Sequence, residues 1–423
     1  MAYVIGQAPP RVQSVARGLG RARRPGHASE RMISLPPRLQ ALLDAEIPRF
    51  SDAEMARRRA LVEAAMGEAG AEHLVFCGYN RAGSAVQWLT EWPVTAEAIG
   101  VLSPGKPDAM FVQWVNHAPL ARRFADKAEV VEWGGESTIE KVIDVLVRRG
   151  ARKDRVAIIG PMRFEQHAAL TEKFGKTTNL NRAYGRLRAV KSEEELDWLR
   201  IGAAFSDAGM MGLRDAIKPD VSERELGDAV ERAYVGAGGG TGIHYIGTTS
   251  MHASDLAVPR QFPSPRRVGK GDVVVAEITA HFYDYGGQVL RSFSVDEEPT
   301  PLYRALHDAA DATFAAVAAV LKPGTLPAEV IAASRVIEDA GFTIIDDLLH
   351  GYGGGYLQPV LGSTSRPSGP VPETPFRAGQ TVVIQPNVVT ADGKAGVQTG
   401  ELGVITEDGF ESLHSFPRGF GRV

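Results

Sequence analysis

Residues 271–293 constrain the fold of this chain more than any other part of its sequence. They read GDVVVAEITAHFYDYGGQVLRSF, and the dense Val, Ile and Thr residues predict two neighbouring strands. We expect Gly286 and Gly287 to provide a bulge or a tight turn, because glycine adopts backbone conformations closed to other residues. Glu277 and Gln288 interrupt the apolar pattern, and polar groups in such places need a partner or a function. The two strands are therefore predicted to form one wall of a pocket.

Length and composition narrow the class of protein. A chain of 423 residues is too long for one ordinary core, so two domains are expected. The net charge of −4 argues against a nucleic-acid partner. The single cysteine, Cys77, excludes an internal disulfide and a cysteine-based metal site. No apolar run reaches the roughly 18–20 residues that span a bilayer. We expect a cytoplasmic protein with a small-molecule substrate and no membrane partner.

The first 35 residues differ in composition from the rest of the chain. Residues 1–35 are rich in Arg, Gly, Pro and Ala, and Glu30 is their one acidic residue. We interpret them as a basic flexible arm. A transit peptide is the alternative, whereas no apolar segment of the kind found in secretion signals is present.

Residues 36–185 are predicted to form an α/β domain. Ser51 and Glu54 have the spacing of a helix N-terminus, and the strand-like segments HLVFCG, AIGVLSP and RVAIIG are interspersed with helical segments such as STIEKVIDVLVRRG. No phosphate-binding glycine loop stands at a junction between a strand and a helix. We therefore expect no nucleotide site in this domain.

Residues 186–423 are predicted to form an α+β domain with helices on a largely antiparallel sheet. Capping boxes at Ser192 and Ser222 predict two helix starts. Two more helices are expected, at about residues 301–321 and 327–340. The end of the chain is rich in strand-like segments, TVVIQPNVV and GVQTGELGVIT among them.

Several segments occur in the order typical of one family. They are AVKSEEELDWLR, VPRQFPSPRRVGKGDVVVAEITAHFYDYGGQVLRSF, HGYGGGYLQP, VVIQPNVV and GVQTGELGVITEDG. Residues 50–423 resemble the creatinase, prolidase and methionine aminopeptidase (M24-type) superfamily through these motifs. The resemblance implies a creatinase-type α/β N-terminal domain, an α+β "pita-bread" catalytic domain and a homodimer.

The resemblance also implies which positions would hold metal. Peptidases of this superfamily bind two divalent ions with two Asp, one His and two Glu residues. The residues at those positions here are, in chain order, Glu277, Gln288, His350, Gln385 and Gly400, with Glu401 beside the last. Arg260 and Leu357 stand where the family carries catalytic histidines.

Charge balance argues against a dinuclear site. Two divalent ions bring four positive charges, and the chain offers only Glu277 and Glu401 as carboxylates. Gln side chains are neutral and weak ligands, and uncompensated charge in a pocket is costly. We predict no metal and no cofactor. A single ion held by Glu277, His350 and Glu401 remains an alternative.

Apart from Gly400, the altered metal-ligand positions stayed polar, which predicts a pocket lined with amides. The amides concerned are Gln288, Gln358, Gln385 and Gln398. Such a pocket suits a neutral or zwitterionic substrate recognised by hydrogen bonds. Creatinase is the metal-free precedent on this fold. Its catalytic residues are nevertheless replaced by Arg260, Leu290 and Gln385, so creatine hydrolysis by its mechanism is not expected.

The predicted function is a metal-independent, creatinase-like hydrolase or lyase for a small polar C–N compound, such as an amide, amidine or amino-acid derivative. Glu277 and His350 are the predicted catalytic residues, with an ion pair and a structural histidine as the alternatives. The predicted substrate-binding residues are Arg260, Gln288, Arg291, Tyr352, Gln385, Gln398 and Glu401. The two arginines would clamp a carboxylate, although a structural role is favoured for Arg291. The alternative functions are a metallopeptidase of the Xaa-Pro dipeptidase kind with atypical ligands and a non-catalytic binding protein.

Overall fold

The computed structural model describes residues 33–79 and 84–423. The predicted basic arm lies outside the described residues, apart from its last three positions. No helix in the described part of the chain is long and apolar enough to cross a membrane.

The first sheet confirms the strands predicted in the N-terminal half. Its strands are β1 (His73–Tyr79), β2 (Glu97–Ser103), β3 (Lys106–Val112), β4 (Val130–Trp133), β5 (Val156–Ile159) and β6 (Thr178–Asn179). They lie in the order β4-β3-β2-β1-β5-β6. The pairs β1–β2 and β2–β3 are antiparallel, and the outer pairs are parallel. The sheet is therefore mixed, as α/β domains with hairpins allow.

The helices of the N-terminal half range from 3 to 17 residues in length. They are α1 (Pro37–Asp44), α2 (Asp52–Glu68), α3 (Ala85–Thr90), η1 (Val115–His117), α4 (Ala118–Phe124), α5 (Thr138–Arg148), α6 (Phe164–Phe174) and α7 (Asn181–Ala189). The predicted start of α2 is confirmed, because the Ser51 hydroxyl accepts a bond from the Glu54 amide at 3.1 Å. The predicted domain boundary between residues 185 and 186 falls inside α7 and stays a prediction.

The second half contains the two longest helices, of 24 and 20 residues, and several shorter ones. They are α8 (Glu193–Ala216), α9 (Glu223–Tyr234), η2 (Val235–Ala237), α10 (Pro301–Val320), α11 (Pro327–Ala333) and α12 (Val336–Asp339). Both predicted capping boxes are present, at Ser192 and at Ser222. The helix predicted at 327–340 is divided in two. Ser334 ends α11, since its hydroxyl donates to the Ile331 carbonyl at 2.8 Å and so competes with regular helical bonding.

A second, largely antiparallel sheet confirms the predicted α+β architecture. Its strands are β7 (Gly240–Ser250), β8 (Asp272–Phe282), β9 (Tyr285–Ser294), β11 (Leu349–Tyr352), β12 (Tyr356–Leu361), β13 (Thr381–Ile384), β15 (Gly400–Thr406), β16 (Gly409–Ser412) and β17 (Gly421–Arg422). The main order is β12-β11-β13-β15-β9-β8-β7. A small separate pair consists of β10 (Thr343–Ile344) and β14 (Val388–Val389).

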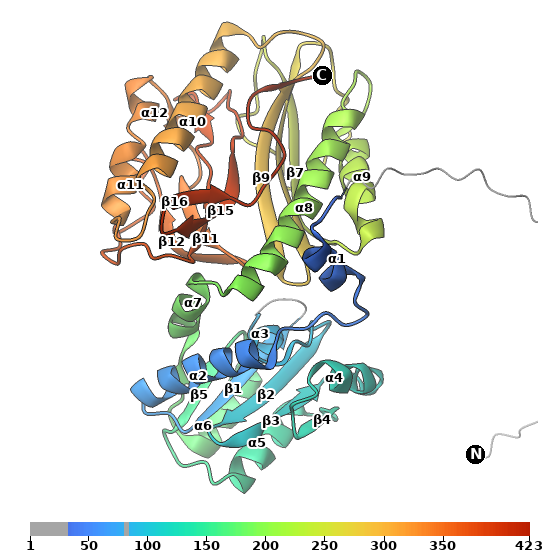
Figure 1. Ribbon diagram of the computed structural model, residues 1–423, viewed down its shortest axis with the longest axis vertical. Helices are drawn as coiled ribbons and strands as arrows, with labels where there is room; N and C mark the ends of the chain where they lie inside the picture. Colours follow the sequence, from blue (N-terminus) through green and yellow to red (C-terminus); the bar gives the residue numbers. More distant parts are fainter. Residues whose placement is uncertain (1–32, 80–83) are drawn as a thin grey trace, which may run out of the picture. The chain divides into compact units, whose positions relative to one another are not determined.

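Helices cover the sheet on different sides. In Figure 1, α10, α11 and α12 lie at the left and α9 at the right, with β7 and β9 between them. Val274, Ala276 and Ile278 of β8 belong to the core that includes α8. Val273 and Val275 belong to the core that includes α10. Because strand side chains alternate, the next residue on the α10 side is Glu277.

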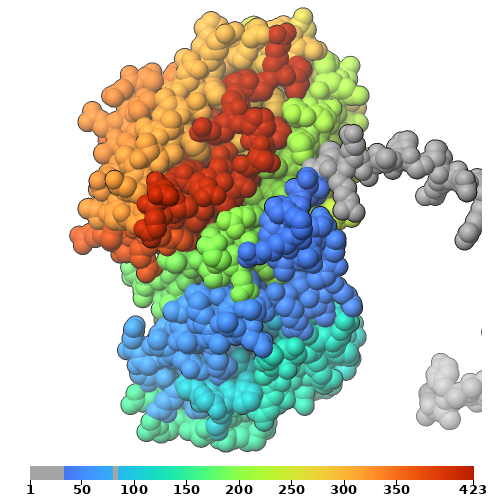
Figure 2. All heavy atoms as spheres, viewed as in Figure 1, coloured from blue at the N-terminus to red at the C-terminus, as the bar shows by residue number. Residues whose placement is uncertain are grey.

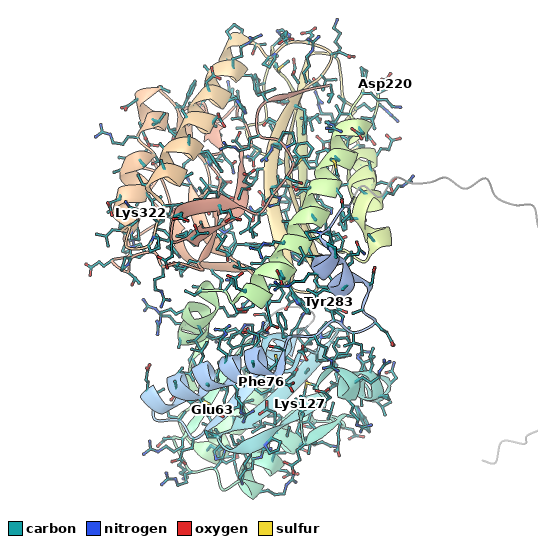
Figure 3. The ribbon with its side chains drawn as sticks, viewed as in Figure 1. Glu63, Phe76, Lys127, Asp220, Tyr283 and Lys322 are labelled. Carbon is teal, nitrogen blue, oxygen red and sulfur yellow. The ribbon has the colours of Figure 1, made fainter. Side chains whose placement is uncertain are left out.

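The turn between β8 and β9 differs from the sequence prediction. Its two central residues are Tyr283, labelled in Figure 3, and Asp284, and Tyr283 has a positive φ of 52°. Gly286 and Gly287 lie within β9, where they are required by close packing. A Cβ on Gly287 would lie 2.2 Å from the Ala203 Cα of α8, and one on Gly286 would lie 2.2 Å from the His281 ring.

Candidate functional site

A chain of hydrogen-bonded side chains joins three of the predicted site residues. The Gln288 amide nitrogen donates to Glu277 Oε1 at 3.0 Å and to Gln385 Oε1 at 2.9 Å. Gln288 pairs with Thr279 across β8 and β9, so its side chain lies on the same face as Glu277. The structure therefore brings Glu277, Gln288 and Gln385 together.

His350 lies at the other end of this chain. The Gln385 amide nitrogen donates to the Asp347 carbonyl at 3.3 Å. The Tyr356 hydroxyl donates to the two Asp347 carboxylate oxygens at 2.6 and 2.7 Å. The Tyr356 ring stacks on the His350 ring, with 3.7 Å between centroids. Tyr352 contacts His350 edge to face, with 5.8 Å between centroids.

The hydrogen bond of the His350 ring fixes its tautomer. Its Nδ1 lies 3.0 Å from the Gly351 carbonyl oxygen, which can only accept. Nδ1 is therefore the protonated nitrogen, and Nε2 is a buried acceptor that forms no hydrogen bond of regular geometry. Burial lowers the pKa of His350, and Asp347, the Gly351 carbonyl and the Gln385 side chain oppose this shift. The ring is neutral and holds a lone pair on a buried nitrogen.

Two carboxyl groups of the site are held close to their protonated form. Burial, together with the charges of Asp346 and Asp347, raises the pKa of Glu277 to about 8. Burial also raises the pKa of Asp346 to about 7, although the Asn387 amide donates to its Oδ2 at 3.1 Å. Asp346 Oδ1 has no protein partner. Glu277 is thus mainly a neutral carboxylic acid at neutral pH.

Arg291 and Glu401 lie on the opposite face of the sheet. Glu401 pairs with Val289, and Leu290 with Glu277, so strand alternation turns Glu401 and Arg291 away from the Glu277 side. Arg291 Nη2 lies 2.5 Å from Glu401 Oε2. The guanidinium also donates to the carbonyls of the C-terminal segment, which runs in red across the face shown in Figure 2. The structure does not bring Arg291 and Glu401 to the hydrogen-bonded chain of Glu277, Gln288 and Gln385 (the amide chain). The predicted substrate-binding role of the pair stays a prediction.

The remaining predicted residues have mixed surroundings. Arg260 Nη1 donates to the buried Glu223 carboxylate at 3.0 Å. Gln398 is buried, and neither of its amide atoms has a protein partner. Tyr352 is buried, and its hydroxyl lies 3.4 Å from His281 Nε2. Of these three, Tyr352 contacts the catalytic candidate His350, whereas Arg260 is occupied by an ion pair.

The donor set does not fit the metal centre that the resemblance implies. Gly400 has a φ of +155°, and a Cβ there would lie 2.3 Å from the Ile384 carbonyl oxygen. No side chain can replace the missing glutamate at this position without a backbone shift. Within residues 33–79 and 84–423, no three His, Cys, Asp or Glu side chains are grouped so that they could hold an ion. The suggested trio of Glu277, His350 and Glu401 is not assembled.

A cavity of about 600 Å³ lies at one end of the same strands. It is bordered by His281, Tyr283 and Asp284 from the β8 end, and by the glycines of residues 238–242 and 354–355. His281 is four residues from Glu277 on β8, so both side chains lie on one face of the strand. The cavity therefore lies at the end of the strand face that carries Glu277.

Sequence reasoning missed Asp346 and Asp347. Both precede β11, and the segment TIIDDLLH places two acids inside an otherwise apolar run. That contrast was the available signal, since paired acids between apolar residues need a partner or a function. Their contacts with Tyr356 and Asn387 depend on the tertiary fold.

The fold and the site positions together define a protein of the creatinase and prolidase class. The family model for metallopeptidase family M24 matches residues 197–407, and the chain belongs to the M24 superfamily.

Sequence relatives of this chain carry the names of dipeptidases. The chain is 27% identical over 245 residues to the probable dipeptidase PepE of Mycobacterium tuberculosis, covering 55% of this chain and 60% of that protein. It is 26% identical over 236 residues to the Xaa-Pro dipeptidase of Pyrococcus furiosus, covering 54% of this chain and 63% of that protein. The match thus spans less than two thirds of each of these relatives.

Solved structures support the fold over most of the chain. The Xaa-Pro dipeptidase from Bacillus anthracis superposes with a TM-score of 0.73 at 18% identity, covering 87% of this chain and all of that one (100%). Dipeptidase PepE from Mycobacterium ulcerans gives a TM-score of 0.71 at 23% identity, covering 89% of this chain and 99% of that one. The predicted fold class is confirmed.

Proposed function

We propose that this chain is a metal-independent, creatinase-like hydrolase or lyase for a small polar C–N compound. The observation that carries the proposal is the amide chain of Glu277, Gln288 and Gln385 at positions where family relatives hold metal. The Gln288 amide donates hydrogen bonds to Glu277 and to Gln385. A pocket of this chemistry orients a substrate by hydrogen bonds.

The protonation states suggest a division of roles. Neutral His350 offers Nε2 as a general base that takes a proton from an attacking water. Glu277 accepts from Gln288 through Oε1, which leaves its other oxygen to carry a proton. With a pKa raised to about 8, Glu277 can give that proton to the leaving nitrogen. Gln288 and Gln385 hold the acid in place.

Substitution of the two catalytic candidates tests this proposal. Release of amine or ammonia from a panel of small amides, ureas and amidines would be followed for the native protein, Glu277→Gln and His350→Ala. We expect each variant to lose about 10²–10⁴-fold in turnover, and chelator treatment to leave native turnover unchanged. The surface pair His252 and Glu297, 3.0 Å apart, supplies matched controls in His252→Ala and Glu297→Gln. Full activity in both site variants would refute the assignment.

A second candidate is a metallopeptidase of the Xaa-Pro dipeptidase kind. The names of the relatives favour it. It requires a bound metal, so elemental analysis of protein purified without chelator separates the two proposals. Near-stoichiometric zinc, manganese or iron, together with chelator-sensitive hydrolysis of an Xaa-Pro dipeptide, would establish the peptidase. Binding without turnover of any compound would instead indicate a non-catalytic binding protein.

A further inference from the structure

Buried carboxylates in this chain are neutralised by cations. The buried Asp and Glu residues of the described chain are Glu54, Glu91, Glu97, Asp108, Glu195, Asp197, Asp207, Glu223, Asp272 and Glu401. Each of them forms a salt bridge with Arg or His. This is the usual solution, because an unpaired buried charge is costly.

Three acids of the candidate site have no salt bridge of this kind within the described residues. Glu277, Asp346 and Asp347 are partly buried, and within residues 33–79 and 84–423 no Arg, Lys or His lies within salt-bridge distance of them. They interact instead with neutral groups, the amides of Gln288 and Asn387 and the Tyr356 hydroxyl. The site thus gathers three acids without a salt-bridge partner, and Arg366 acts on Asp346 only from beyond salt-bridge distance.

Two buried acceptor atoms of the candidate site lack a regular hydrogen bond. His350 is fully buried, and its Nε2 forms no hydrogen bond of regular geometry, although the Gln385 side chain acts on the ring. Because Nδ1 is bonded to the Gly351 carbonyl, Nε2 is the ring nitrogen left for a ligand. The charge of Asp347 also acts on that ring. Asp346 Oδ1 is buried without a partner as well. Both atoms are acceptors, so the complementary ligand is one that donates.

The cations predicted to hold an anionic substrate are already engaged. Arg291 is paired with Glu401 on the other face of the sheet, and Arg260 is paired with Glu223. A carboxylate ligand would therefore meet acids rather than free guanidinium groups. A ligand with positively charged N–H donors would satisfy the acids and the unpartnered acceptors together.

We propose that the site binds its substrate through a cationic nitrogen group, an ammonium or an amidinium, held by Asp346 and Asp347. This inference rests on the proposed function for the location of the site and narrows its substrate to cationic C–N compounds. The group would lie beside His350 Nε2, with Glu277 and its amide partners on the far side.

Binding of matched small probes tests the inference without any turnover. Benzamidine, benzylamine, benzamide and benzoate share a ring and differ in charge. Their dissociation constants for chelator-treated native protein would be measured by ligand-observed NMR and calorimetry. We expect benzamidine or benzylamine to bind at least about tenfold more tightly than benzamide, because hydrogen bonds to charged groups are the stronger ones. Equal binding of the four probes, tighter benzoate binding, or no cation binding at millimolar concentration would overturn the proposal.

Charge-removing variants assign the effect to the two aspartates. Asp347→Asn and Asp346→Asn are each expected to weaken the cationic probe by about tenfold. Asp339→Asn, on the exposed end of α12, removes the same charge nearby and should leave the affinity unchanged. Thermal unfolding of each variant verifies the fold. If a variant fails to fold, the comparison of probes on the native protein still decides. Probe binding with unaltered turnover in Glu277→Gln would refute the proposed catalysis and leave the cation site standing.

Discussion

The two faces of β9 differ in how their charged side chains are paired. On one face, Arg291 is paired with Glu401 and donates to backbone carbonyls, so its donors are used within the protein. On the other face, Gln288 links Glu277 to Gln385, and no Arg, Lys or His of the described residues forms a salt bridge with the acid. Alternate residues of one strand therefore serve the fold and the candidate site. The positions most altered from the family pattern lie on the second face.

Breaking the ion pair should have the largest effect on stability. Arg291→Met leaves Glu401 buried without a counterion, so we expect the free energy of unfolding to fall by about 3–5 kcal/mol. Denaturant unfolding measures it. The double variant Arg291→Met with Glu401→Gln should recover part of the loss, because the buried charge is then removed. A single variant as stable as the native protein would show that this face is not structural.

Two buried glutamines, Gln385 and Gln398, should respond differently to the same change. Gln385→Leu removes the acceptor of the Gln288 amide, so we expect a loss of about 1–3 kcal/mol. Gln398→Leu replaces an amide with no protein partner and should be neutral or stabilising. Denaturant unfolding of both variants at one pH gives the comparison. Equal losses would mean that the hydrogen-bonded chain does not stabilise the site.

The pH dependence of stability reports on Glu277. Its pKa is raised to about 8 in the folded protein, so the folded state binds the proton more tightly than the unfolded state. Its contribution is present at low pH and is lost as the pH rises through about 8. We expect the difference in unfolding free energy between native protein and Glu277→Gln to fall by up to about 1.4 kcal/mol per pH unit between about pH 5 and 8. Parallel pH curves for the two proteins would contradict the raised pKa.

The smallest effect is expected at Tyr356. Tyr356→Phe removes the hydroxyl that donates to Asp347 and keeps the ring that stacks on His350. Because Tyr356 is half exposed, with 54% of its surface accessible, we expect a stability loss of about 0.5–1.5 kcal/mol. Affinity for benzamidine should change little, because the Asp347 carboxylate is retained. A loss of cation binding as large as that of Asp347→Asn would assign the role to the tyrosine.

Local features of the fold could be predicted from the sequence. Helix starts at Ser51, Ser192 and Ser222 follow from side chains three residues apart. The strands β8 and β9 follow from their apolar residues. The position of their turn did not, because Gly286 and Gly287 are needed for packing against His281 and α8. The prediction that Gly286 and Gly287 form the turn was therefore wrong, because the turn lies at Tyr283 and Asp284.

The candidate site could be predicted only in part. The proximity of Glu277, Gln288 and Gln385 followed from the family positions. The direction of Glu401 depends on its register with β9 and on the unusual φ of Gly400, which no local pattern reveals. The partners of Arg291 lie more than a hundred residues away in sequence, at Pro417 and Phe416. Long-range register and loop packing therefore decided which predicted residues meet.

The central claim is that uncharged amides have replaced a metal centre in this site. Anomalous diffraction from crystals grown with manganese tests it most directly. We expect no ordered ion between Glu277, Gln288 and Gln385, and the Gln288 amide still bonded to both neighbours. Two ordered manganese ions bridged across these side chains would contradict the account.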